Sequence, residues 1–453
     1  MTGERHLPGV ASAGGRPNRQ IRIKSSNLCD ANVTQYSGYI DVAEDKHLFF
    51  WFFEARNNKR EDSPLILWLN GGPGQSSMTG LMGELGPCRV NENGNSTTNN
   101  PYAWNDHAHV LFLDQPTNVG FSYGADVLTT VDAANDVHLL LLQFYKNFPE
   151  YTKGPLHVFG QSYGGHYVPA VAKAIHDFNK ELLDKKGHDN LKDDKRDRRI
   201  LPLSSIGIGN GLVNPLVQYK YYSKMACDST YPAVISKEAC NSMEAATPIC
   251  EMLIQSCNRW NDTFTCSTAL EFCVRNIRNV VVHFGQDIDD IRLKCDDNDR
   301  SCYPHIHRIN EYLNNPKVQD KIGAEISDFT LYSTKVYEKF ALNGDEVKSF
   351  DQNIPPLLAD GIRVLVYAGD ADYICNWYGN KAWTMQMEWP GQKKFNAAKD
   401  SEWHTSNSEL AGEVRTSDNL TFIRVFEAGH MVPYDKPAAA LDMINRWIDD
   451  KPF

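Results

Sequence analysis

The segment "VFGQSYGGHYVPA" (residues 158–170) places Ser162 between glycines, directly after a short apolar run. Residues 155–160 read as a buried strand, and the apolar periodicity of residues 164–185 predicts a helix. Gly160-Gln161-Ser162-Tyr163-Gly164 therefore matches the G-x-S-x-G pattern, in the strand–turn–helix context that a nucleophile elbow needs. Glycines let neighbouring backbones approach a strained serine closely. Alone, the pattern fits a glycine-rich turn equally well, so its interpretation depends on the rest of the chain.

Short apolar runs recur on both sides of this segment. They predict strands at residues 47–55, 64–70, 109–116, 203–211, 362–370 and 420–430, with an amphipathic closing helix at 436–448. The alternation predicts an α/β fold with a central, mostly parallel sheet. The cysteine-rich, more helical stretch between them is interpreted as an insertion that caps the C-terminal edge of the sheet. The predicted organisation is a flexible tail (1–28), a core in two parts (29–212 and 351–453) and a cap insertion (213–350).

A serine nucleophile needs a base, and the base needs an orienting acid. In α/β-hydrolases these residues follow in the order Ser, acid, His, each after a strand. His430 follows the last predicted strand, while Asp370 and Asp372 both follow the strand before it. Asp372 is preferred because Asp370 comes directly after a glycine in a turn, although position alone leaves both open. The run Asn-Gly-Gly-Pro-Gly (70–74) follows an early strand, where this fold supplies the backbone N–H groups of an oxyanion hole.

The chain has eleven cysteines, of which eight lie between residues 227 and 302. There is no C-x-x-C and no histidine at zinc-finger spacing, so neither a metal nor a cofactor is predicted. In residues 250–257 and 266–273, cysteines seven apart fall on one face of a helix. If these two helices form an antiparallel hairpin, the numbers of paired cysteines have a constant sum. The predicted disulfides are Cys250–Cys273 and Cys257–Cys266, then the local pairs Cys227–Cys240 and Cys295–Cys302, with Cys29–Cys88 as a further candidate.

The balance of charge is acidic, with 57 acidic and 46 basic residues and a formal net charge of −11. This argues against nucleic acid as a partner, because no broad cationic face is available for phosphates. No stretch approaches the roughly 18 consecutive apolar residues of a membrane span. The disulfides and four N-x-[ST] triplets point to the secretory pathway, secreted or vacuolar, although the N-terminus lacks the apolar core of a signal peptide. We therefore expect a targeting segment that is absent from this chain; the triplets begin at Asn32, Asn95, Asn261 and Asn419.

Several longer segments extend these motifs, among them "NVTQYSGYIDV" (32–42), "LILWLNGGPG" (65–74), "FLDQPTNVGFSY" (112–123), "YAGDADYICNW" (367–377) and "AGHMVP" (428–433). In this order, and over nearly the whole chain from about residue 30, they resemble the serine carboxypeptidases. The resemblance implies an α/β-hydrolase fold with a helical, disulfide-bonded insertion. It implies a peptide substrate whose C-terminal residue is released through an acyl-enzyme, with Ser162, Asp372 and His430 as the triad.

The same resemblance implies how the substrate is held. The backbone N–H groups of Gly72 and Tyr163 would form the oxyanion hole. The terminal carboxylate would meet Asn70, Gly71, Glu84 and Gln161. The pocket for the penultimate side chain would be lined by Tyr163, Leu212, Tyr219, Tyr222 and Ile374, with Gly83 beside the leaving-group pocket and the thiol of Cys375 unpaired nearby.

Gln161 departs from the family pattern, which has glutamate before the nucleophile. That glutamate pairs with the counterpart of Glu84, and two carboxyl groups bind a substrate carboxylate only when protons are present, because like charges disfavour joint ionisation. A glutamine amide donates hydrogen bonds at any pH. Two outcomes follow: carboxylate binding with weaker acid dependence, or degraded carboxylate recognition that favours esters, amides or acyl transfer.

Two further departures affect the cap and the pocket. Gln75 stands where the family has a cysteine, and residues 326–336, where its partner is expected, contain none; this predicts a looser attachment of the insertion. Gly83 replaces an aromatic residue of the yeast-type enzymes and predicts room for a bulky leaving group. The predicted function is a serine carboxypeptidase. The alternative is an acyltransferase or condensing enzyme that passes an acyl group to an amine or alcohol, and an intact triad disfavours a non-catalytic binding protein.

Overall fold

The structure is a computed structural model that describes residues 20–57, 62–185, 199–294 and 302–453. A single large sheet runs through it, with strands in the order β1-β2-β3-β7-β4-β9-β10-β11-β14-β13-β12. From β7 to β14 neighbouring strands are parallel, and the pairs at both edges are antiparallel. The strands are β1 (Ile21–Ser25), β2 (Gln35–Ala43), β3 (Lys46–Phe53), β4 (Leu65–Leu69), β7 (His109–Leu113), β9 (Leu156–Ser162), β10 (Leu203–Gly211), β11 (Arg363–Gly369), β12 (Ser401–His404), β13 (Leu410–Ser417) and β14 (Leu420–Val425), while β8 (Tyr123–Gly124) pairs with β3 and β5 (Cys88–Val90) pairs with β6 (Thr97–Asn99).

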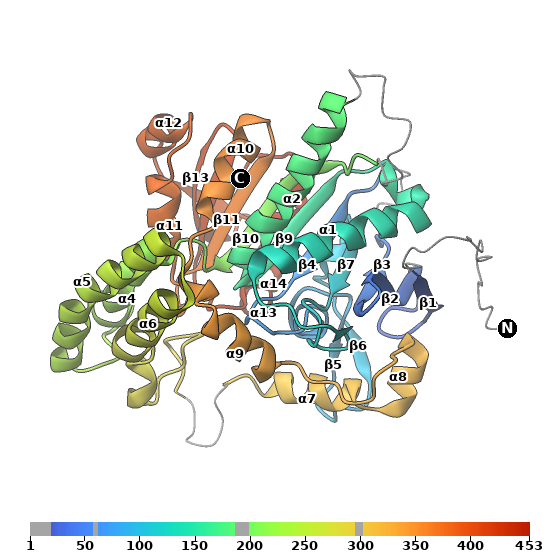
Figure 1. Ribbon diagram of the computed structural model, residues 1–453, viewed down its shortest axis with the longest axis horizontal. Helices are drawn as coiled ribbons and strands as arrows, with labels where there is room; N and C mark the ends of the chain where they lie inside the picture. The colour runs from blue at the N-terminus through green and yellow to red at the C-terminus, as the bar shows by residue number, and fades with distance from the viewer. Residues whose placement is uncertain (1–19, 58–61, 186–198, 295–301) are drawn as a thin grey trace.

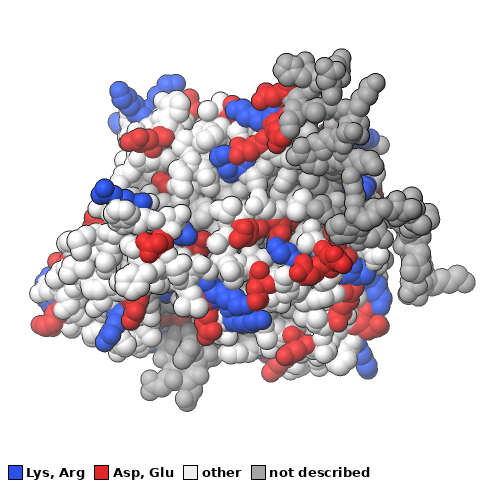
Figure 2. Space-filling model, in the orientation of Figure 1, with Lys and Arg blue, Asp and Glu red and all other residues white. Residues whose placement is uncertain are grey.

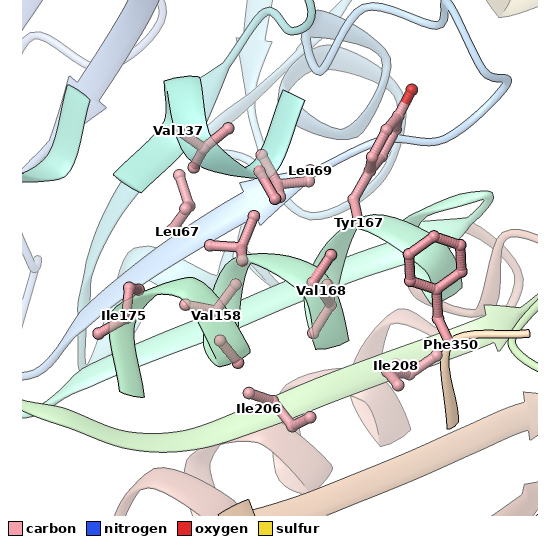
Figure 3. Packing of buried hydrophobic residues seen from close by; sticks show 14 of the residues in the cluster. Leu67, Leu69, Val137, Val158, Tyr167, Val168, Ile175, Ile206, Ile208 and Phe350 are labelled. Carbon is pink, nitrogen blue, oxygen red and sulfur yellow. The ribbon is translucent and has the colours of Figure 1, made fainter. Parts of the chain in front are cut away.

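Helices cover both faces of this sheet, as expected for an α/β-hydrolase. Side chains alternate along β4, so that Leu65, Leu67 and Leu69 pack in one apolar cluster while Ile66 and Trp68 pack in another. Helices α1 (Thr130–Asn147), α2 (Gly164–Lys185), α10 (Ile354–Ala359), α11 (Trp377–Gln386) and α12 (Gln392–Ala397) contribute to the first cluster, and α14 (Pro437–Ile448), preceded by α13 (Val432–Asp435), packs in the second. Figure 3 shows the first cluster, where Val137 of α1 and Val168 and Ile175 of α2 face side chains of β4, β9 and β10.

The edge of the sheet differs from the sequence prediction at the N-terminus. A flexible tail was expected through residue 28, yet Ile21–Ser25 form β1, which pairs antiparallel with β2. The Arg22 guanidinium donates two hydrogen bonds of 2.8 Å to the Asp41 carboxylate. The side chain of Ser37 on β2 also donates to Ile322 O at 2.8 Å, which ties this edge to the insertion. Such long-range pairings leave no local pattern in residues 20–28.

The described chain between β10 and β11 adds no strand to the large sheet, and the predicted insertion (213–350) falls within this interval. Its helices project beside the sheet and along one end of it (Figure 1). They are α3 (Pro215–Gln218), α4 (Tyr222–Cys227), α5 (Lys237–Trp260), α6 (Thr263–Cys273), α7 (Pro304–Leu313), α8 (Pro316–Ile322) and α9 (Thr334–Leu342). Helices α5 and α6 pack on one another as a hairpin. Between described residues the structure forms Cys250–Cys273, Cys257–Cys266, Cys227–Cys240 and Cys29–Cys88, as the sequence predicted. The predicted pair Cys295–Cys302 includes Cys295, which lies outside the described residues.

The predicted weak attachment at Gln75 is not what the structure shows. Gln75 forms an antiparallel bridge with Tyr332. On either side, Ser76 N donates to Leu331 O and Ser333 N donates to Gly74 O, both at 2.8 Å. Backbone hydrogen bonds therefore join the core and the insertion at the place where the family has a cysteine.

Charged side chains are interspersed over the face of the molecule seen in Figure 2, with acidic and basic groups side by side. This face carries no broad cationic surface, in agreement with the acidic composition. Of the helices that the structure describes, none has both the length and the apolar character that crossing a membrane requires.

Candidate active site

Ser162 ends β9 at the centre of the sheet, and α2 begins two residues later. Its φ of 63° lies in the left-handed region, which side chains other than glycine rarely adopt. The turn is packed so tightly that glycine is required around it. A Cβ on Gly160 would lie 2.7 Å from Leu69 O, and one on Gly165 would lie 2.5 Å from Leu212 O. The backbone strain therefore places the Ser162 side chain at the carboxyl end of the sheet.

Asp372 and His430 meet at the same edge, after β11 and β14. His430 Nδ1 lies 2.9 Å from Asp372 Oδ2, and both side chains are buried. Asn210, at the end of β10, donates from Nδ2 to the same carboxylate oxygen at 2.7 Å. Burial lowers the pKa of His430, but the charge and hydrogen bond of Asp372 together with the charges of Asp289 and Glu84 outweigh burial, and the pKa rises to about 9. The pair therefore stabilises a protonated imidazole.

Asp370, the alternative acid, has a different set of partners. Its Oδ1 accepts from Tyr231 O–H at 2.7 Å and from Glu427 N at 2.9 Å, and Arg424 forms an ion pair with Oδ2 at 3.1 Å. These contacts join β11, β14 and the insertion. Asp370 is thus part of the scaffold, and of the two aspartates only Asp372 forms a hydrogen bond with His430 in the described structure.

The Asn-Gly-Gly-Pro-Gly loop passes directly against the turn that carries Ser162. A Cβ on Gly71 would lie 2.3 Å from Tyr163 N and 2.9 Å from the Cβ of Ser162. Gly72 has a φ of 105° and Gly74 a φ of 96°, so the loop adopts conformations that favour glycine. The structure therefore brings the backbone of Gly71, the residue before Gly72, against the N–H group of Tyr163, the second donor expected for an oxyanion hole.

A chain of hydrogen bonds links this loop to the histidine. Trp68 Nε1 and Gly80 N both donate to Asn70 Oδ1, at 2.7 and 3.0 Å, which fixes the orientation of the Asn70 amide. Asn70 Nδ2 then donates to Gln161 Oε1 at 3.4 Å, and Gln161 Nε2 donates to His430 O at 2.6 Å. Gln161 is therefore held between the loop and the residue that carries the imidazole.

Glu84 is buried beside this chain. Neither of its carboxyl oxygens has a hydrogen-bond partner of good geometry among the described residues. Burial raises the pKa of Glu84 to about 7, and the nearby side chains of His430, Asn70 and Gln161 oppose the rise. A carboxyl group with this pKa changes its protonation state near neutral pH.

The residues expected to line the penultimate-residue pocket lie together. Leu212 N donates to Ser162 O at 2.9 Å, which fixes Leu212 beside the turn. The rings of Tyr219 and Tyr222 are 5.0 Å apart, and Tyr222 O–H donates to Ile374 O at 2.6 Å. These contacts form an aromatic and aliphatic wall between the insertion and the loop after β11.

Two acidic residues that the sequence reasoning missed support this wall. Tyr163 O–H donates to Asp345 Oδ2 at 2.7 Å, and Thr130 N donates to the same oxygen at 3.0 Å. The next residue, Glu346, forms a buried ion pair with Arg278. Burial raises the pKa of Tyr219 and the charge of Arg278 opposes the rise, which places Arg278 close to the pocket. No local motif marks these residues, whereas Asn210 could have been found from its place at the end of a predicted central strand.

The room predicted beside Gly83 is not present. A Cβ at this position would lie 3.3 Å from His305 Cδ2 and Nε2 and from Ile309 Cδ1. The His305 ring stacks on Tyr434 with centroids 4.3 Å apart. Helix α7 therefore fills the space that an aromatic residue at position 83 would occupy, which removes one argument for a large acceptor molecule.

The fold and the serine-bearing turn define the chain as an α/β-hydrolase. The family model for serine carboxypeptidases matches residues 26–450, and the chain belongs to that family. Carboxypeptidase Y homolog A of Sclerotinia sclerotiorum is 45% identical over 435 residues, covering 95% of this chain and 76% of that protein. The protein of the same name from Sordaria macrospora is 43% identical, covering 100% of this chain and 78% of its own length.

A solved structure agrees with this assignment. The crystal structure of Kex1Δp, a prohormone-processing carboxypeptidase from Saccharomyces cerevisiae, matches with a TM-score of 0.78 and 26% identity, over 94% of this chain and 93% of that one. The chain is therefore a serine-type carboxypeptidase, a hydrolase with the α/β-hydrolase fold.

Proposed function

We propose that Ser162, His430 and Asp372 are the nucleophile, the general base and the orienting acid of this carboxypeptidase. The observation that carries the proposal is the 2.9 Å contact of His430 Nδ1 with Asp372, at the sheet edge where Ser162 stands in a strained turn. With Nδ1 engaged, Nε2 is the nitrogen available to accept the serine proton. Asn210 keeps the carboxylate in place through its bond to Oδ2.

The reaction follows from these positions. The neutral form of His430 takes the proton of Ser162 as Oγ attacks the carbonyl carbon of the last peptide bond, and the N–H groups of Gly72 and Tyr163 receive the charge on the carbonyl oxygen. The imidazolium, stabilised by Asp372, then protonates the leaving amine as the C–N bond breaks. Water, deprotonated by His430, then attacks the acyl carbon; the bond to Ser162 Oγ breaks, the imidazolium returns its proton to that oxygen, and the shortened peptide leaves. The products are a peptide with a new carboxylate and a free amino acid.

Carboxylate recognition in this site depends on two kinds of donor. Gln161 and Asn70 each carry an amide NH₂ group, and one N–H of each is engaged in the chain of hydrogen bonds to His430 O. Amide N–H groups need no added proton, so these side chains could donate to a substrate carboxylate at any pH. Glu84 donates only when protonated, which its raised pKa of about 7 permits in weak acid. We infer a preference for free C-terminal carboxylates that weakens, without vanishing, as Glu84 ionises.

The test is a pair of substrates that differ only at the C-terminus. A blocked dipeptide and its C-terminal amide are compared from pH 4.5 to 8.5, with and without an added amine. Release of the free amino acid with preference for the acid substrate supports the proposal, and product formed only in the presence of the amine would overturn it. Mass spectrometry after treatment with a serine-directed phosphonylating reagent should locate the adduct on Ser162.

We also propose that the protein matures in the secretory pathway. Disulfides persist in oxidising compartments, and the structure contains them in both the core and the insertion. Asn32, Asn95 and Asn261 of the N-x-[ST] triplets are exposed, so a glycan could be attached at each of them. Treatment with an N-glycosidase should lower the mass of the protein purified from its own source, and an unchanged mass would contradict the proposal of N-glycosylation.

A further inference from the structure

A loop of the insertion, residues 286–293, lies against both loops that carry the proposed catalytic residues. His430 N donates to Asp289 O at 2.7 Å. The neighbouring Ile288 O accepts from Tyr373 N and Ile374 N, at 3.2 and 2.9 Å. Asp289 is thereby held between the segment after β11 and the segment after β14. Its carboxyl group is a second acidic side chain near the imidazole.

Three aspartates in this loop differ in what they bind. Asp287 Oδ1 accepts from the backbone N–H groups of Asp289 and Asp290, at 2.6 and 2.9 Å, and so shapes the turn. Asp290 forms an ion pair with Arg292. The Asp289 carboxylate has no hydrogen bond or ion pair with any residue in the described ranges. It is the acidic group of this loop that no side chain in the described ranges binds directly, although the His430 imidazole lies near enough to interact with its charge.

The surroundings of Asp289 make ionisation of its carboxyl group unfavourable. The side chain is half-buried, and burial raises its pKa to about 6, with the His430 charge opposing the rise and neighbouring aspartates adding to it. At neutral pH the carboxylate is ionised but poorly solvated. A cation brought into contact with it would therefore be attracted more strongly than at an exposed site.

The walls of the site indicate which part of the substrate meets Asp289. The rings of Tyr303 and Tyr434 lie 5.7 Å apart, and Tyr434 stacks on His305 at 4.3 Å. His305 in turn covers Gly83, which precedes Glu84. The Tyr303 ring also lies 5.8 Å from the His305 ring, so the three rings form one cluster. Burial raises the pKa of Tyr303, and the nearby carboxylates of Asp435 and Asp289 raise it further, so Tyr303 is the ring of this cluster close to Asp289. The cluster therefore lies near Asp289 through Tyr303 and against Gly83, the residue before Glu84, through His305.

We propose that Asp289 makes this carboxypeptidase selective for substrates whose C-terminal residue carries a cationic side chain, lysine or arginine. The substrate would place its terminal carboxylate near Glu84 and Gln161 and its side-chain cation against Asp289. The inference rests on the proposed function, because it takes the leaving residue to lie between His430 and Glu84.

The test uses blocked dipeptides with a constant penultimate phenylalanine and a C-terminal Leu, Gln, Lys, Arg or Glu, assayed at pH 7.5 and low ionic strength. For the native enzyme kcat/KM should be higher with Lys and Arg than with the uncharged Gln. In Asp289→Asn the ratio of kcat/KM for Lys over Leu should fall by about tenfold or more, the effect expected for one partly desolvated ion pair. Asp289→Glu keeps the charge and should retain most of the preference.

Asp290→Asn is the matched control, because it removes the same formal charge from the next residue, where Arg292 already balances it. In this variant the ratio of kcat/KM for the Lys substrate over the Leu substrate should stay within about twofold of the native value. Thermal unfolding shows whether each variant is folded. The inference is overturned if Asp289→Asn keeps the native ratio, or if the preference for a cation follows the penultimate residue in a second substrate series. If the native enzyme hydrolyses none of the dipeptides, the proposed function itself fails, which is a different result.

Discussion

Replacing Gln161 by glutamate puts a titratable group into the chain of hydrogen bonds that reaches the histidine. In the native protein Gln161 Nε2 donates to His430 O at 2.6 Å. A glutamate of the same shape places an oxygen there, facing a carbonyl oxygen that can only accept. The hydrogen bond survives only if the carboxyl group keeps its proton. The substitution therefore changes one protonation requirement and leaves the size of the side chain nearly constant.

The size of the effect follows from the neighbouring carboxyl group. Burial raises the pKa of Glu84 from 4.5 to about 7, and position 161 is buried to a similar degree. A glutamate at position 161 should have its pKa raised by about 2 to 3 units, and the two acids would then titrate as a coupled pair. Above the apparent pKa each pH unit reduces the active fraction tenfold, which corresponds to about 1.4 kcal/mol. The activity of Gln161→Glu relative to the native enzyme should fall about tenfold or more between pH 5 and pH 8.

The assay is kcat/KM for a blocked dipeptide measured across that range for both proteins. Gln161→Met serves as control, because it removes the hydrogen bond to His430 O without adding a titratable group and should lower activity by a similar factor at every pH. Superimposable pH profiles of Gln161→Glu and the native enzyme would refute the role assigned to Gln161.

Three further variants test the remaining parts of the site. Ser162→Ala should lower kcat by about 10⁴-fold or more without loss of the folded state, and residual activity above that level would argue against Ser162 as nucleophile. The pKa of Glu84 is higher in the folded protein than in the unfolded chain, so stability is lost as pH rises from 4.5 towards 7, by about 3 kcal/mol. Glu84→Gln should therefore unfold at a higher temperature than the native protein at pH 8 and at the same temperature at pH 4; equal values at both would contradict the raised pKa. Tyr163→Phe removes one of the donors to Asp345 and should reduce the free energy of unfolding in urea by about 1 to 2 kcal/mol, whereas no change would show that the bond contributes nothing.

The parts of the fold that were predicted from sequence are those with strong local patterns. The apolar run before Ser162 and the glycines after it predict a strand, a turn and a helix, and the structure has β9 and α2 at these positions. Cysteines seven apart in helical segments gave the α5–α6 hairpin, because the spacing constrains both helices at once. The rule of chain order at strand ends pointed to His430 and left Asp370 and Asp372 open, and the family resemblance selected Asp372.

The parts that were missed depend on contacts between distant segments. Asp345 is 182 residues from Tyr163, whose hydroxyl donates to it, and no periodicity links them. Asp289 reaches His430 through a backbone carbonyl, a contact that any residue could make. The prediction of free space at Gly83 was wrong because it considered only the small size of glycine and did not include helix α7, which packs over this position. Local sequence reports what a segment can form, and packing partners decide what fills the space around it.

The bridge between Gln75 and Tyr332 has a consequence for redox chemistry. The four disulfides with both cysteines in the described residues close within the core or within the insertion, and at Gln75 the two parts are joined by backbone hydrogen bonds. A thiol reductant would loosen each part internally without cutting a covalent link between them. The pairing of Gly74–Gln75 with residues 332–333 would then not depend on the redox potential of the compartment. The same holds for the position that this pairing gives the loop beside Ser162.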